Sequence, residues 1–131
     1  MARVFNLVLF DSTISGDTLA NNPPVFYTSQ EHAALLGSVE RLQIQMIVRA
    51  ATVFPSQVDV VYQMTNAPEY DVWVDSSAKS VTTGGSVSTL PAVAFDNISS
   101  IANQAAYGRF KIFCSTASNV HFQLVVSGYA D

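Results

Sequence analysis

The sequence has one cysteine and few charged side chains, and each scarcity excludes a class of function. With a single cysteine among its 131 residues, the chain can form no intrachain disulfide and no zinc site built on several thiolates. Only six residues are basic, they are scattered, and the formal net charge is −4. A protein that neutralises nucleic-acid phosphates needs clustered Lys and Arg, so we expect no nucleic-acid partner.

Long apolar runs are missing as well. The run at residues 5–10 is interrupted by Asn6 and followed at once by Asp11, which makes it too short for the apolar core of a signal peptide. No stretch approaches the roughly 18 apolar residues that cross a membrane as a helix. We therefore expect a soluble chain that is made in a cytoplasm and has no membrane partner.

The sequence does contain many polar residues that carry no charge. Apolar residues make up 49% of the chain and charged residues 12%, whereas about 25% charged is usual for a soluble domain. Ser, Thr, Asn and Gln fill the difference, so little charge repulsion holds copies apart. This composition suits a protein that is bound to others, although many secreted β-domains share it.

Apolar and polar residues alternate along much of the chain, which is the pattern of strands with one buried face. The two clearest strands lie in VERLQIQMIVRA and QVDVVYQMT, and two more are predicted at residues 107–114 and 120–127, joined by a hairpin turn. The inward positions are then Leu42, Ile44, Met46, Val48, Val58, Val60, Tyr62, Met64, Phe110, Ile112, Cys114, Phe122, Leu124 and Val126.

The whole pattern predicts an all-β fold, an antiparallel β-sandwich of jelly-roll-like form. Further strands are expected at RVFNLVLF, at residues 25–28 and at residues 70–75, followed by a Ser/Thr/Gly-rich loop at residues 76–91. We divide the chain into an N-terminal strand and extended arm, residues 1–24, and a β-sandwich domain, residues 25–131.

One short helix is expected near residues 29–36. Thr28 and Glu31 have the spacing of a capping box, and Gly37 stands where a C-terminal cap belongs. A second short helical or irregular piece is expected at residues 96–106.

Cys114 and His121 are candidates for a nucleophile and its base. Strand side chains point alternately to the two faces of a sheet, so Cys114 would face the core with Phe110 and Ile112. His121 would face solvent, opposite Phe122. A thiolate and an imidazole must lie within hydrogen-bond reach to act together, so we reject the dyad and expect no enzyme.

The sequence gives little support for a metal or cofactor site. His32 has no second histidine at HxxxH or HxH spacing and is interpreted as a solvated helix residue. Asp71 and Asp75 would lie about 13 Å apart along one strand face, too far to grip one ion together. A calcium site would need oxygens from a neighbouring loop. We expect no cofactor and no metal.

Trp73 and Tyr70 are the aromatic residues of interest. On a strand at residues 70–75, Trp73 would share the face of the two aspartates and be partly exposed. Two interpretations remain open: a sugar-stacking platform, and a side chain covered by a loop or a neighbouring subunit.

The layout QVDVVYQMTNAPEYDVW, a polar loop and then YGRFKIFCSTASNVHFQLVVSG resembles small virion proteins of tailed bacteriophages, of the capsid decoration (cement) type. The residues that carry the resemblance are Trp73 after a strand and turn, and Tyr107, Gly108 and Phe110 in a strand that pairs with the last one. The segment at residues 66–70 departs from the Asp-Gly turn usual before that tryptophan.

The resemblance implies a non-enzymatic protein, made in the host cytoplasm, that binds the outer surface of the virion capsid. Its partners would be the major capsid protein and further copies of itself, as a homotrimer, and it would stabilise contacts between capsomers. The alternatives are a carbohydrate-binding β-sandwich module and a tail or baseplate component of the same virion. The residues expected at an interface are Val4, Phe5, Leu7, Leu9, Phe10, Tyr70 and Trp73.

Overall fold

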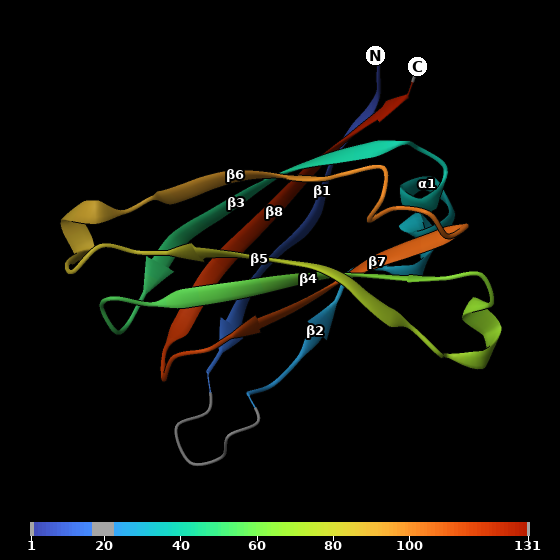
Figure 1. Cartoon of the computed structure of the whole chain (residues 1–131). Coiled ribbons are helices and arrows are strands. Elements are labelled where there is room, and N and C mark those ends of the chain that lie inside the picture. Colours follow the sequence, from blue (N-terminus) through green and yellow to red (C-terminus); the bar gives the residue numbers. More distant parts are fainter. Residues whose placement is uncertain (1, 17–22, 131) are drawn as a thin grey trace.

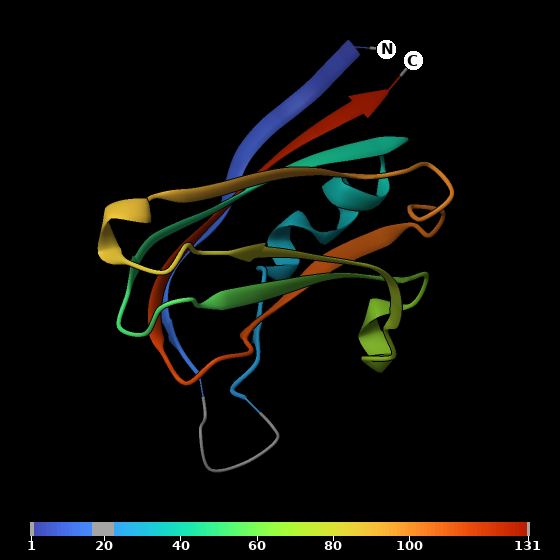
Figure 2. The same ribbon diagram turned by 60° about the vertical axis from the view of Figure 1, so that its left-hand side comes forward.

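Two four-stranded antiparallel sheets face each other in the computed structural model, which describes residues 2–16 and 23–130 (Figures 1 and 2). Sheet A has the order β1 (Ala2–Ser15), β8 (Asn119–Ala130), β3 (Arg41–Ala51), β6 (Ala92–Ile98). Sheet B has the order β2 (Phe26–Tyr27), β7 (Tyr107–Cys114), β4 (Gln57–Thr65), β5 (Val74–Thr82). The expected all-β sandwich is confirmed, but the predicted hairpin of the last two strands is wrong, because β7 and β8 lie in different sheets.

The core lies between the sheets and is built from the positions that the alternation predicts. Every second residue is fully buried from Leu42 to Val48 on β3 and from Phe122 to Val126 on β8. Met64 is the exception, since it is only partly buried where it packs against the core. Its neighbour Gln63, on the outer face of β4, is buried because its amide is hydrogen-bonded to Asp75 and Arg109 there.

One polar side chain is buried where the two sheets meet α1 (Ala33–Gly37). The Asn103 amide accepts a hydrogen bond from the Tyr62 hydroxyl at 2.7 Å and donates to the carbonyl oxygens of Leu36 and Val39 at 3.0 and 2.9 Å. These bonds fasten the irregular segment after β6 to the end of α1. Gly108 makes room for this arrangement, since a Cβ there would lie 1.9 Å from the Tyr62 hydroxyl.

The short helix is confirmed near its expected place, but its predicted caps are wrong. A 3₁₀ turn, η1 (Gln30–His32), precedes α1, and the Ser29 side chain, not that of Thr28, accepts from the Glu31 backbone N–H. Thr28 is instead buried, where its hydroxyl accepts from the Phe110 N–H at 3.0 Å. Gly37 is the last residue of α1, and a Cβ there would lie 2.1 Å from the Ala106 carbonyl oxygen.

The prediction of a strand at residues 70–75 is wrong. The chain forms a 3₁₀ turn, η2 (Pro68–Tyr70), and Asp71 takes a left-handed conformation with φ 53°, which breaks any strand there. β5 begins only at Val74 and runs through the first part of the segment expected to be a loop. It is an edge strand whose Ser and Lys residues hide the alternation. A further 3₁₀ turn, η3 (Val87–Thr89), follows it.

β1 is a long edge strand of sheet A. It pairs with β8 from Ala2 to Ser15, with register shifts between Arg3 and Phe5 and between Val8 and Phe10. Among the described strands, none pairs with its outer edge. Residues 17–22 of the expected arm lie outside the described residues. No helix in the described part of the chain is long and apolar enough to span a membrane.

Candidate functional site

The thiol and the imidazole lie apart, as the alternation predicts. Cys114 is fully buried, and its Sγ lies 3.3 Å from the Thr116 hydroxyl. His121 points outward from sheet A, with Nε2 2.6 Å from Oδ1 of Asp11 on β1. That hydrogen bond is the main reason why the pKa of the Asp11 carboxyl is lowered from its ordinary value of 3.8, with a further hydrogen bond from Gln123. Cys114 and His121 therefore form no catalytic pair.

The residues considered for metal binding are engaged elsewhere. Asp71 lies 3.8 Å from the Arg109 guanidinium, and Asp75 accepts from the Gln63 amide at 2.7 Å, so the two do not share one strand face as expected. His32 lies 3.8 Å from Glu31, and its Nδ1 is buried without a partner in the described structure. In residues 2–16 and 23–130, no group of three or more His, Cys, Asp and Glu could hold a metal ion.

Trp73 packs on the outer face of sheet B, where it covers an arginine. The Arg109 guanidinium carbon lies 4.4 Å from the Trp73 ring centroid and 4.0 Å from that of Tyr27. Arg109 Nε also donates to the Gln63 amide oxygen at 2.8 Å, and its side chain is only 13% exposed. The cation thus holds the segment before β5 and the short strand β2 against the sheet, which leaves one face of Trp73 closed to a sugar ring.

An apolar hollow of about 580 Å³ opens at the end of the sandwich beside η2. Its rim exposes Tyr70, Val72 and Val74, which are 75%, 65% and 58% exposed. No lining residue carries a charge. The residues that define this apolar hollow are Met64, Thr65, Asn66, Ala67, Tyr70, Val72, Val74 and Ala105.

A second surface lies on the outer face of sheet A and is rich in side-chain amides. It surrounds a small hollow of about 100 Å³ and draws on all four strands of the sheet. We name it the amide face, defined by Asn6 on β1, Val125 and Ser127 on β8, Gln43 and Gln45 on β3, and Phe95 on β6.

The strand register places these side chains in two adjacent rows. Ser127 lies between Asn6 and Gln43, and Gln45 lies between Val125 and Phe95. The Ser127 hydroxyl donates to the Asn6 amide oxygen at 2.8 Å. Phe95 stands at the strand edge and is 64% exposed.

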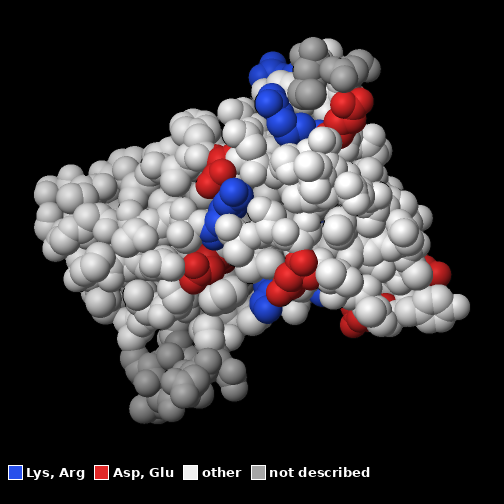
Figure 3. Space-filling model, viewed as in Figure 1, with Lys and Arg blue, Asp and Glu red and all other residues white. Residues whose placement is uncertain are grey.

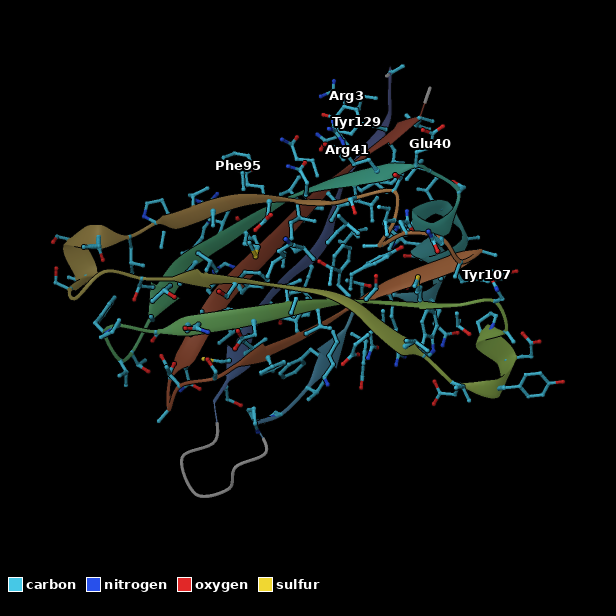
Figure 4. The ribbon with its side chains drawn as sticks, viewed as in Figure 1. Arg3, Glu40, Arg41, Phe95, Tyr107 and Tyr129 are labelled. Carbon is cyan, nitrogen blue, oxygen red and sulfur yellow. The ribbon has the colours of Figure 1, made fainter. Side chains whose placement is uncertain are left out.

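Charges lie at the two ends of the amide face and not within it. At one end, Tyr129 is flanked in register by Arg3 and Arg41, and the Arg41 guanidinium lies 4.9 Å from the Tyr129 ring centroid. Phe95 lies on the same side of the molecule as these three residues (Figure 4). At the other end stand Asp11 and its partner His121. On the face of the molecule drawn in Figure 3, charged side chains form small groups separated by uncharged areas.

The structure divides the residues expected at an interface into two groups. Val4 and Tyr70 are well exposed, at 54% and 75%. The others are partly or fully buried, packed against the core or, for Trp73, against Arg109; these are Phe5, Leu7, Leu9, Phe10 and Trp73. Val8, which the sequence reasoning did not single out, is 59% exposed on β1. Contact of these residues with another chain stays a prediction.

No protein-family model and no curated protein matches this sequence, but solved structures share its fold. The PBSX exported protein XepA, a phage-derived protein, matches with TM-score 0.58 and 14% identity over 98% of this chain. A carbohydrate-binding module from glycoside hydrolase family 9 (Cel9A) of Ruminococcus flavefaciens FD-1 matches with TM-score 0.57 and 12% identity over 98% of this chain.

The two matches differ in how much of the other chain they cover. This chain spans 38% of the length of XepA, whereas it covers 99% of the carbohydrate-binding module. At such low identity the likeness shows a shared β-sandwich fold. Because one fold serves proteins with different functions, this likeness does not assign a binding surface to the chain.

Proposed function

We propose that this chain is a non-enzymatic bacteriophage virion protein that docks on the outer capsid surface and stabilises contacts between copies of the major capsid protein. The observation that carries the proposal is the apolar hollow, which leaves Tyr70, Val72 and Val74 in water at one end of the sandwich. Large exposed apolar groups that lie together are typical of a protein–protein contact.

The chemistry of the hollow suits docking on a protein shell. Burying one Val side chain gains about 1.5–3 kcal/mol, and no lining residue carries a charge that would have to be desolvated. A single copy would bind modestly on this surface. Copies joined to one another would bind a repeating lattice much more tightly, because each further contact becomes intramolecular.

The outer edge of β1 supports the proposed self-association. An unpaired edge strand is a template for another chain, and Val4 and Val8 add exposed apolar side chains beside it. We propose that copies join through this edge as a homotrimer. Mass measurement in solution tests the step: a trimer supports it, and a chain that stays monomeric at high concentration contradicts it.

The docking test uses purified particles of the virus that encodes this chain, stripped of it and then mixed with added protein. We expect Tyr70→Ser combined with Val72→Ser to reduce co-sedimentation with the particles at least tenfold. Val87→Ser is the matched control, since Val87 is 71% exposed on η3, at the opposite end of the sandwich (Figure 1). Equal binding by the double variant and the wild type would contradict docking through the hollow.

The same particles distinguish a capsid role from a tail or baseplate role. Imaging with and without the chain should show the loss of protrusions from the head, and heads that lack it should burst at a lower temperature. Density lost from the tail alone would support the tail component instead. Particles that look and behave alike with and without the chain would contradict a virion role.

A further inference from the structure

The amide face is built from side chains that combine hydrogen-bonding groups with little charge. A side-chain amide offers two N–H donors and one carbonyl acceptor, so it can serve a hydroxyl group in either direction. Among the described residues, no side-chain hydrogen bond of Gln45 is formed, and Gln43 accepts only a long one from Tyr129, at 3.4 Å. These amides thus have unused capacity on an open sheet face.

Phe95 supplies an apolar ring beside the amides. It pairs in register with Gln45, and side chains opposite each other on neighbouring strands lie about 5 Å apart. Phe95 is 64% exposed, and Val93, two residues earlier on the same face of the edge strand, is 46% exposed. A flat apolar ring next to polar groups is suited to a ligand that has one apolar face and a polar rim.

We infer that the amide face binds a neutral glycan, with a sugar ring stacked on Phe95 and its hydroxyl groups bonded to Gln43 and Gln45. Sugar rings carry C–H groups on their faces and hydroxyls around their rims, which matches this combination. The inference is independent of capsid docking, because the amide face and the apolar hollow share no residue.

The shape and charge of the surface favour an extended neutral chain. Four strands at about 4.8 Å spacing give a face about 14 Å wide, whereas the central hollow of about 100 Å³ is too small to enclose a small molecule. The two central rows hold no charged side chain, so a neutral ligand would lose no ionic hydration there. Arg3 and Arg41 at one end could contact an acidic sugar only beyond these rows.

The experiment compares two exposed aromatic residues that lie on different surfaces. Binding of the wild-type chain is first surveyed on an array of neutral and acidic glycans, and the strongest neutral oligosaccharide is then titrated by calorimetry. Phe95→Ala and Gln45→Ala are each expected to raise its Kd at least tenfold, and Phe95→Trp to preserve binding. Tyr70→Ala is the matched control, since Tyr70 is 75% exposed at the apolar hollow, and it should leave the Kd unchanged.

Three results would overturn the inference. The first is a wild-type chain that binds no neutral glycan on the array. The second is an unchanged Kd for folded Phe95→Ala, with folding checked by thermal melting. The third is a chain that binds no glycan but loses particle binding when Phe95 is replaced. That result would assign the amide face to a protein partner. Loss of particle binding in Tyr70 variants alone would leave the inference intact, so the two proposals fail separately.

Discussion

The outer faces of the two sheets use similar polar and aromatic side chains in opposite ways. On sheet B, Arg109 is enclosed by Tyr27, Trp73 and Gln63, with Asp71 nearby, so these side chains are in contact with one another. On sheet A, the amides of the central rows and the ring of the edge strand remain largely free. The difference shows that the only tryptophan has a structural role in packing, whereas an exposed phenylalanine is the better candidate for contact with a ligand.

The largest expected loss of stability comes from removing the buried hydrogen bonds of Asn103. Asn103→Ala removes one acceptor and two donors, which leaves the Tyr62 hydroxyl and two backbone carbonyls without these partners. We expect the free energy of unfolding to fall by about 3 kcal/mol, measured by urea denaturation. Asn97→Ala, an exposed amide on β6, is the control and should change it by less than about 0.5 kcal/mol. Equal values for the two variants would contradict the buried role of Asn103.

A smaller loss of stability is expected from a change on the outer face of sheet B, and none from a matched change on sheet A. Arg109→Ala opens the enclosed cluster on sheet B, and we expect a loss of about 2 kcal/mol in the free energy of unfolding, since a largely buried cation loses ring contacts and a hydrogen bond. Emission of Trp73, the only tryptophan, should shift to longer wavelength as its ring becomes wetter. Arg49→Ala, at an exposed arginine on sheet A, should change neither value. An unshifted spectrum in Arg109→Ala would show that the cation does not cover the ring.

The smallest expected effect is on how the Tm changes with pH, and it arises at the charged end of sheet A. Because the pKa of Asp11 is lowered in the folded chain, its carboxylate form stabilises the fold above the ordinary value of 3.8, and that contribution is lost as the pH falls through the folded pKa. The Tm of the wild type should therefore fall more steeply below about pH 3.8 than the Tm of Asp11→Asn. Melting curves between pH 2 and pH 6 measure this. Parallel curves would show that the contact with His121 adds no stability.

The buried half of the molecule could be predicted from sequence because its signal is local. In β3 and β8 every second residue is apolar, and that spacing alone places Leu42 and Phe122 in the core. The same reasoning failed at residues 70–75, where a turn with a left-handed Asp71 contains the same mixture of residue types as a strand. β5 was missed because an edge strand with polar side chains resembles a loop.

The candidate surfaces could not be predicted, because each depends on pairings between distant parts of the chain. Gln43 and Gln45 were recognisable as outward residues, but Asn6 joins them only because β1 pairs with β8 and β8 with β3. Arg109 meets Trp73 across 36 positions, and no sequence pattern signals that contact. The alternation predicts which side of a strand faces water. It does not predict which strands become neighbours.

The single cysteine has a practical consequence for testing both surfaces. Cys114 is sealed inside the sandwich beneath the turn between β7 and β8, so its thiol should be out of reach of alkylating dyes while the protein is folded. A cysteine introduced in place of Tyr70 or Phe95 would be the one that a dye reaches. Fluorescent labels can then be attached to either surface in turn with the native thiol left in place.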